Sequence, residues 1–346
     1  MIHEGPRHTH RARGSGPRDA HLLWSFAADG PIEAQVTAAP DETTLYVATL
    51  GGSLIALGRA GEERWRVALG GRAYGAPCVA EDGTIYVGSD AHAFRAVTPE
   101  GRVRWTLETT GEADTSGAMT PDGAVVFAAG REVFLVSASG DVLWRFAAKG
   151  KVFTSPAVAG DGTVIVGAQD HHVYAITKAG ALAWKVDLGQ DVDGAAVIAE
   201  DGAVFVGTDG GEVVRLDAAG NIVFRAPVGG FVRGALSLSR TGEVLAGTYG
   251  PVPRVVRVAA DGKVREVFTE HGTGAREFGI HGGPLEDDRG TLLFGTQADA
   301  VYAVNTAGDV LFRFATGDDV DAPVTLLGDG TLLVASDDGK VYALGP

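Results

Sequence analysis

The sequence predicts an all-β fold, a closed eight-bladed β-propeller built from an internal repeat of about forty residues. Two series of residues that run in step along the chain predict it. The first series consists of turn glycines that each precede an apolar β run, at intervals of 40, 39, 40, 40, 48 and 40 residues: Gly83, Gly123, Gly162, Gly202, Gly242, Gly290 and Gly330. A divergent copy at Asp41–Thr43, ahead of Leu45–Val47, brings the number of repeats to eight.

The second series consists of aromatic residues. Every tryptophan of the chain occupies one repeat position, and two phenylalanines continue the series: Trp24, Trp65, Trp105, Trp144, Trp184, Phe224 and Phe312. From Trp65 onward, each of these residues lies four positions after a turn glycine, as Trp65 follows Gly61. A position this regular is typical of a packing contact, and we expect these rings to be buried between neighbouring blades.

One repeat shows the strands of a blade. Val152–Ala159, Thr163–Ala168 and His172–Thr177 are short apolar runs separated by turn residues, and a fourth run carries Trp184. Four short antiparallel strands make one propeller blade. A single blade cannot bury both of its faces, so the repeats are expected to pack in a ring.

The two ends of the chain indicate how the ring closes. The last repeat ends at Pro346 after its third strand, whereas a spare outer strand, Leu22–Ala27, precedes the first repeat. We therefore expect this strand to complete the last blade. The chain then divides into a solvated, disordered tail at residues 1–20 and a single propeller domain at residues 21–346.

Composition narrows the classes of partner and environment. The net charge of −15 disfavours phosphate backbones, so no nucleic-acid partner is expected. Cys78 is the only cysteine, which excludes an intrachain disulfide, and no run approaches eighteen apolar residues, so no membrane span is predicted. The basic N-terminus lacks an apolar run, which predicts a cytoplasmic protein without a signal peptide, or a periplasmic one if a signal has been removed. We expect a monomer.

The repeat resembles a known family. Units such as Gly162–Gly167, Val173–Ile176 and Gly180 followed by Trp184 are similar to the PQQ-like repeat of bacterial propellers, over roughly residues 22–346. That superfamily includes quinoprotein alcohol dehydrogenases and BamB-type outer-membrane assembly lipoproteins, and the resemblance implies eight blades with docked outer tryptophans. The dehydrogenases would imply a quinone in the channel, a Ca²⁺ ion, long insertions and often a disulfide of adjacent cysteines. This chain has one cysteine and lacks those insertions, so no cofactor is expected; the BamB-type proteins imply a scaffold that binds partner proteins.

A candidate site lies where the innermost strands begin. Counting nine residues back from each of the seven turn glycines gives one residue per blade: Tyr74, Asp114, Phe153, Asp193, Arg233, His281 and Asp321. In the first copy, Glu33 occupies the same position if one inserted residue is allowed. Unlike the tryptophan position, this one varies between acidic, basic and aromatic residues. Variable polar residues around a channel mouth predict a ligand-binding site, with a water-filled funnel as the alternative.

The 48-residue interval marks a second candidate sector. Two extra residues fall in Tyr249–Pro253 and six in Thr269–Ile280, on loops expected to rise from blade six and its junction with blade seven. These loops bring Tyr249, His271 and Arg276 near Arg233 and His281, a set suited to binding an anionic group or to acid–base chemistry. Drift of a tolerated loop is the alternative. No metal site is expected.

The sequence is compatible with three functions. The leading hypothesis is a non-catalytic scaffold that binds a protein, peptide or small ligand on the loop-bearing face. The second is a lyase or hydrolase acting on an anionic substrate through His281, Arg233 and Tyr249. The third is a quinone- or metal-dependent oxidoreductase. The chain contains no G-x-S-x-G, HExxH, P-loop or CxxC pattern, which favours the non-catalytic hypothesis.

Overall fold

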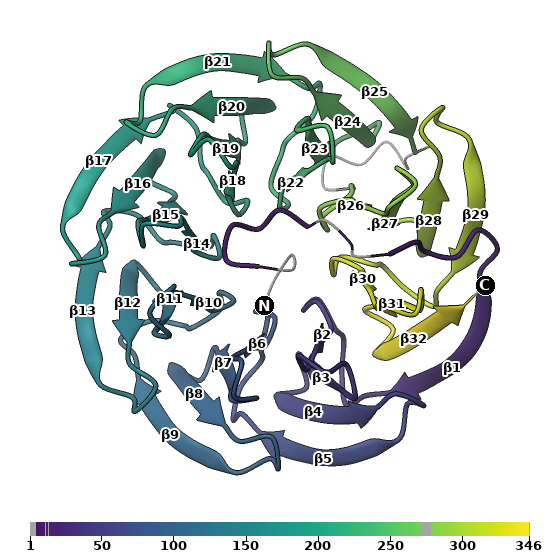
Figure 1. Cartoon of the computed structure of the whole chain (residues 1–346), viewed down its shortest axis with the longest axis horizontal. Coiled ribbons are helices and arrows are strands. Elements are labelled where there is room, and N and C mark those ends of the chain that lie inside the picture. The colour runs from purple at the N-terminus through teal and green to yellow at the C-terminus, as the bar shows by residue number, and fades with distance from the viewer. Residues whose placement is uncertain (1–4, 11, 13, 271–277, 346) are drawn as a thin grey trace.

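The computed structural model describes residues 5–10, 12, 14–270 and 278–345. These residues form eight four-stranded antiparallel sheets arranged in a ring around a central channel (Figure 1). The predicted eight-bladed propeller is confirmed. Among the described residues there is no helix with the length and apolar character needed to cross a membrane.

Each blade runs from the channel outward through four strands. The innermost strands are β2 (Thr37–Ala38), β6 (Cys78–Val79), β10 (Ala118–Met119), β14 (Ala157–Val158), β18 (Val197–Ile198), β22 (Ser237–Leu238), β26 (Leu285–Glu286) and β30 (Thr325–Leu326). The second strands are β3 (Thr44–Ala48), β7 (Ile85–Ser89), β11 (Val125–Ala129), β15 (Val164–Gly167), β19 (Val204–Gly207), β23 (Val244–Gly247), β27 (Leu292–Thr296) and β31 (Leu332–Ala335). The third strands are β4 (Ser53–Gly58), β8 (Ala93–Val97), β12 (Glu132–Val136), β16 (His172–Ile176), β20 (Glu212–Leu216), β24 (Arg254–Val258), β28 (Ala300–Val304) and β32 (Lys340–Gly345). The outer strands are β5 (Glu63–Ala68), β9 (Val103–Glu108), β13 (Val142–Ala147), β17 (Leu182–Asp187), β21 (Ile222–Pro227), β25 (Val264–Thr269), β29 (Val310–Ala315) and, for the last blade, β1 (His21–Ala27).

The hydrophobic core is divided among the contacts between blades. Second strands such as β15 are buried on both faces, which explains their continuous apolar sequence, whereas the outer strand β17 alternates between exposed and half-buried residues. The buried residues form eight clusters, each shared by two neighbouring blades; one joins Val126 and Leu135 of blade three to Val164 and Ile176 of blade four. Each blade therefore buries its two faces against its two neighbours.

The tryptophans dock on the next blade, as the repeat predicts, but they are half-buried rather than buried. The indole Nε1–H of Trp65 donates to the carbonyl of Pro99 at 2.8 Å, and its ring lies against Gly101. Gly101 has a φ of 81°, and a Cβ there would lie 2.7 Å from the Trp65 ring. This position needs glycine for both its backbone conformation and its lack of a side chain. The outer face of each ring stays in contact with solvent because the outer strand is the rim of the propeller.

The ring closes where the sequence predicts. Strand β1 pairs antiparallel with β32, with Trp24 opposite Ala343 and Ala27 opposite Lys340. Figure 1 shows the purple strand β1 completing the yellow blade of β30, β31 and β32. Closure leaves the third strand of the last blade without an exposed edge.

The N-terminal segment differs from the expected solvated tail. His8 and His10 are fully buried, and the chain before β1 crosses the ring toward its centre (Figure 1). The carbonyls of Pro6, Arg7 and Thr9 accept hydrogen bonds from the amides of Val158, Ile198 and Leu238, at 2.7, 3.1 and 3.0 Å. The innermost strands are only two residues long, and their amides on the channel side are donors that the carbonyls of a passing segment can accept from. Polar composition alone did not reveal this role.

Candidate binding site at the channel mouth

The channel opens on one face as a cup with a volume of about 540 Å³. The eight residues predicted to surround the channel, here called the ring residues, all line this cup: Glu33, Tyr74, Asp114, Phe153, Asp193, Arg233, His281 and Asp321. Each ring residue lies four positions before its innermost strand, as Glu33 precedes Thr37 and Asp193 precedes Val197. The structure therefore brings together the predicted ring.

The cations of the cup are already paired with carboxylates. Arg233 donates to Asp209 through Nε (3.0 Å to Oδ1) and Nη2 (2.9 Å to Oδ2). Arg72 donates to Asp90 at 2.7 Å, and Lys151 donates to Glu112 at 2.6 Å and lies 3.8 Å from Asp114. Six carboxylates and three cations line the cup, so it carries an excess of negative charge after these pairs have formed.

All three cations that line the cup also lie over the faces of aromatic rings. Lys151 Nζ lies 4.2 Å from the centre of the Phe153 ring, and the guanidinium carbons of Arg72 and Arg233 lie 5.4 Å from the Tyr74 and Phe231 ring centres. Such contacts hold a cation in place through the electron-rich ring face. Together with the ion pairs, they fix these three side chains as part of the wall.

A repeated contact links neighbouring blades around the cup. A side chain in the loop between the second and third strands of one blade reaches the ring residue of the next blade, 24 residues later. Gln169 donates to Asp193 at 3.5 Å, Asp209 binds Arg233, and Gln297 donates to Asp321 at 3.2 Å. Tyr249 reaches His281 in the same way, with a separation of 32 residues because of the eight-residue insertion.

At two positions this link would join like charges. Asp90 precedes Asp114 by 24 residues, and Asp337 takes the loop position of the last blade, next to Glu33 of the first. Burial first, and then repulsion from Asp321 and Glu33, raises the pKa of Asp337 to about 7. Burial likewise raises the pKa of Glu33, with repulsion from Asp321 as the next cause. Negative charge is therefore concentrated where the last blade meets the first.

Several carboxylate oxygens in the cup, and that of Asp337 beside it, have no hydrogen-bond partner among the described residues. These buried atoms are the Oδ1 atoms of Asp114, Asp193, Asp321 and Asp337. Burial also raises the pKa of Asp114 and Asp193, and it raises the pKa of Asp319 to about 6 together with repulsion from Asp321. Buried acceptors without donors favour a ligand that supplies hydrogen-bond donors or positive charge.

The sector predicted to bind an anion is organised differently from expectation. The hydroxyl of Tyr249 and Nδ1 of His281 share a hydrogen bond, and the two rings meet edge to face at 5.8 Å. Burial raises the pKa of Tyr249 well above its ordinary value, so it remains a neutral phenol at pH 7. Arg233 is engaged with Asp209, and His271 and Arg276 lie outside the described residues.

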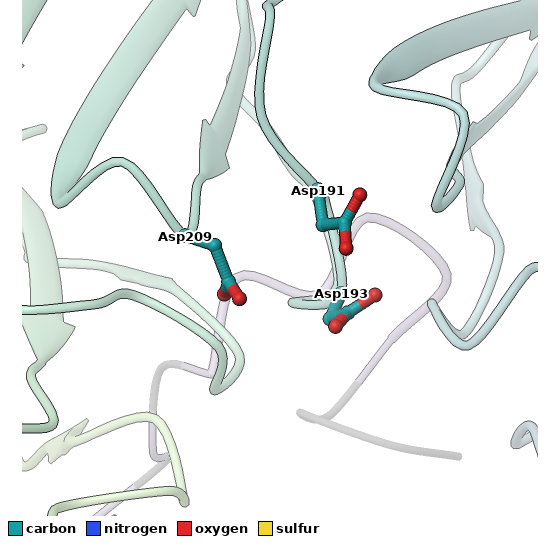
Figure 2. A group of neighbouring side chains, drawn as sticks. All are labelled: Asp191, Asp193 and Asp209. Carbon is teal, nitrogen blue, oxygen red and sulfur yellow. The ribbon is translucent and has the colours of Figure 1, made fainter. Parts of the chain in front are cut away.

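Three carboxylates lie close together beside Arg233. Figure 2 shows Asp191 and Asp193 on one segment and Asp209 on another, and their oxygens lie within 4.8 Å of one another. The set has the chemistry of a cation site. However, Asp209 already binds the cation Arg233, Asp191 lies 3.3 Å from Nε2 of His171, and Asp193 accepts from the neutral amide of Gln169, so each carboxylate already has a protein contact.

A second set of residues that line the cup was not predicted from the sequence, although the repeat contains a pattern that identifies them. Arg72 and Lys151 lie two residues before the ring residues Tyr74 and Phe153, as Glu112 lies before Asp114. In a strand-like segment, residues two apart face the same way, so this position forms a second, outer ring. Extending the repeat arithmetic by one position identifies it.

Comparison with known proteins agrees with the fold. A family model described as outer membrane protein assembly factor BamB matches residues 11–128, 95–184 and 169–277, and the overlap of these matches reflects the repeat. No curated protein sequence matches the chain.

Similar solved structures cover nearly the whole chain. BamB from Moraxella catarrhalis is 16% identical, with a TM-score of 0.78, over 95% of this chain and 100% of that one. The computationally designed Ika8 protein is 14% identical, with a TM-score of 0.74, over 94% and 99%. A europium-containing methanol dehydrogenase is 12% identical, with a TM-score of 0.76, over 100% and 97%. At these identities the likeness concerns the fold alone.

Proposed function

The chain belongs to the family described as outer membrane protein assembly factor BamB, and from this premise we propose that it is a binding scaffold whose cup captures a positively charged group of its partner. The single observation that carries the proposal is the charge arrangement of the cup. Its cations Arg72, Lys151 and Arg233 are each bound by a carboxylate, while buried oxygens of Asp321 and Asp337 lack a donor among the described residues.

The occupant is a lysine or arginine side chain presented by a partner protein or peptide. Both groups are cationic at neutral pH and carry several N–H donors for carboxylate acceptors. The place for it is the junction of the last and first blades, beside Glu33, Asp321 and Asp337. There burial and the neighbouring carboxylates raise the pKa values of Glu33 and Asp337. A cation in this position would offset the repulsion and stabilise the buried negative charge.

Pyrroloquinoline quinone is a poor match for the same cup. The quinone is a planar tricarboxylate, and it would need free cations where this cup offers carboxylates. Arg72 and Arg233, which line the cup, are bound to Asp90 and Asp209. We therefore derive no oxidation step, and the resemblance to a dehydrogenase stays one of fold.

Calorimetric titration with two matched small molecules tests this function. The first is Nα-acetyl-lysine amide, and the second is Nα-acetyl-norleucine amide, which has a similar chain without the amine. We expect saturable binding of the first and at least about tenfold weaker binding of the second, as for loss of one charge-assisted contact. Equal affinity for both, or binding of neither, would contradict the proposal.

Substitution of carboxylates at the cup tests whether the lysine derivative binds there. Asp321→Asn with Asp337→Asn removes two carboxylates while keeping their size, and we expect it to weaken binding of the lysine derivative. Asp217→Asn is the matched control, because Asp217 lies in an exposed turn where its carboxylate binds Asn221. Equal loss in both variants would place the cation elsewhere on an acidic surface.

A further inference from the structure

The described residues of the N-terminal segment, 5–10, 12 and 14–16, lie in the channel on the far side of the cup. Its partners Val158, Ile198 and Leu238 lie five residues along the chain from the ring residues Phe153, Asp193 and Arg233. Ala195 and Ala235, two residues beyond the ring, still line the cup. The segment therefore lies beneath the cup, farther along the same innermost strands.

Main-chain hydrogen bonds carry the segment from blade to blade. The carbonyls of Pro6, Arg7 and Thr9 bind blades four, five and six in turn. Farther along the segment, Ala12 donates to the carbonyl of Glu286 at 3.3 Å, and Gly14 accepts from Asp288 at 2.8 Å, both in blade seven. The segment thus follows the circle of innermost strands.

Three charged side chains of the propeller strengthen the second half of the segment. Arg240 donates through Nη2 to the carbonyl of Ala12 at 2.9 Å, and Asp287 accepts from the amide of Gly16 at 3.1 Å. Arg289 also donates to the carbonyl of Gly16. These contacts recognise main-chain groups of the segment rather than its side chains.

Two histidines provide the side-chain contacts. Nδ1 of His8 lies 3.1 Å from the carbonyl of Ala196, and Nε2 of His10 lies 3.1 Å from the carbonyl of Val324. Burial lowers the pKa of both rings to about 4, so both are neutral at pH 7 and each offers one N–H. Both residues have positive φ, 56° and 46°, a conformation that costs energy for a residue with a side chain. The surrounding contacts hold them there.

One acceptor connects the segment to the cup. The carbonyl of Val324 also lies 3.1 Å from Nε2 of Gln35, which donates to it, and Gln35 lines the cup. A residue of the N-terminal segment and a residue of the cup therefore share one hydrogen-bond acceptor, the carbonyl oxygen of Val324.

The segment is polar and has an exposed connection to the propeller. Residues 5–10 read Gly-Pro-Arg-His-Thr-His, so little of the energy that holds this stretch comes from apolar burial. Arg18 and Asp19, between the segment and β1, are exposed. A segment held by hydrogen bonds, on an exposed connection, can leave without opening the ring of blades.

We propose that this far end of the channel is a peptide-binding site, selective for two histidines one residue apart, and that the chain's own residues 5–16 are its exchangeable ligand. Main-chain bonds supply most of the affinity and the two imidazole contacts supply the selectivity, as when a protein reads an extended peptide. Departure of the segment opens the blind cup into a through channel.

The test uses the full chain, folded before it is cut. A specific protease sequence replaces residues 17–20, a fluorophore is attached to the N-terminal amine, and anisotropy is followed after cleavage. We expect the labelled segment to keep the anisotropy of the whole protein, and to be released when an excess of unlabelled peptide of residues 1–16 is added.

Paired variants separate recognition from simple attachment. His8→Ala with His10→Ala should weaken retention of the cut segment by at least about tenfold, because two buried hydrogen bonds are lost. Arg7→Ala with Thr9→Ala is the control in the same segment, since these residues bind through their carbonyls, and it should change retention less than about threefold. A thermal melt of each uncut chain confirms that it is folded.

Two results would overturn the proposal. In one, the wild-type segment leaves as fast as the histidine variant after cleavage. In the other, excess unlabelled peptide fails to displace the retained segment, which would make it a fixed part of the fold rather than an exchangeable ligand.

Discussion

Arg233 and Asp209 form a two-point ion pair across two neighbouring blades, with Nε and Nη2 of the guanidinium bound to the two oxygens of one carboxylate. This ion pair holds the Arg233 side chain in the wall of the cup. Gln297 and Asp321 form the corresponding link one blade beyond that of Tyr249 and His281. Blade-to-blade links of this kind decide which charges of the cup remain available to a ligand.

A double-mutant cycle measures this pair. Asp209→Ala and Arg233→Ala, alone and together, should give a coupling free energy of about 1–2 kcal/mol, because both side chains are partly exposed and water weakens the pair. Urea unfolding of the four proteins supplies the values. A coupling near zero would mean that the ion pair does not hold the guanidinium in the wall of the cup.

Replacing Asp337 should stabilise the protein in a pH-dependent way. The pKa of Asp337 is raised to about 7 from 3.8, so the folded state binds the proton more tightly than the unfolded chain. Stability is therefore lost as pH rises from about 4 toward 7. We expect Asp337→Asn to raise the melting temperature at pH 8 and to change it little at pH 4. An equal effect at both values would contradict the assigned repulsion.

Removal of one outer tryptophan should have a moderate effect. Trp144→Ala loses the hydrogen bond from Nε1 to the carbonyl of Lys178 and the contact with Gly180. Because the ring is half-buried, we expect a loss of about 2 kcal/mol, below the 3–5 kcal/mol of a fully buried ring. The neighbour Leu143 is 55% exposed, so Leu143→Ala is the control, with little change in the urea midpoint. A similar loss in both variants would argue against docking.

Two truncations distinguish closure from the channel segment. Deletion of residues 1–27 removes β1 and exposes the edge of β32, and size-exclusion chromatography should show aggregation. Deletion of residues 1–16 keeps β1, so the protein should elute at the same volume as the full chain, but its melting temperature should fall because the main-chain bonds to Val158, Ile198 and Leu238 are lost. A wild-type melting temperature in the shorter deletion would contradict the burial of the segment.

The propeller could be predicted from sequence because its packing contacts recur. Trp65 on Gly101 is repeated around the ring, so a single sequence shows the same physical requirement several times. Asp193 and the other ring residues followed from the same arithmetic. The place of β1 followed from the missing outer strand of the last repeat.

The remaining features depend on contacts that occur once or that cross between blades. The pairing of Arg233 with Asp209 joins residues 24 apart, and only the three-dimensional arrangement shows that it removes a free cation from the expected anion site. His8 and His10 lie in a polar stretch with no repeat, and their burial depends on carbonyls of Ala196 and Val324 far along the chain.

The most direct measurement is the affinity of the cup for Nα-acetyl-lysine amide as a function of pH. The amine stays protonated between pH 5 and pH 8, whereas Asp337 and Asp319, with pKa values of about 7 and 6, lose their protons over this range. Binding should therefore strengthen as pH rises, and the Asp321→Asn/Asp337→Asn variant, which keeps Asp319, should lose the part of that dependence that comes from Asp337. Affinity that instead weakens as pH rises, the behaviour of an anion site built on a protonated histidine such as His281, would contradict the account.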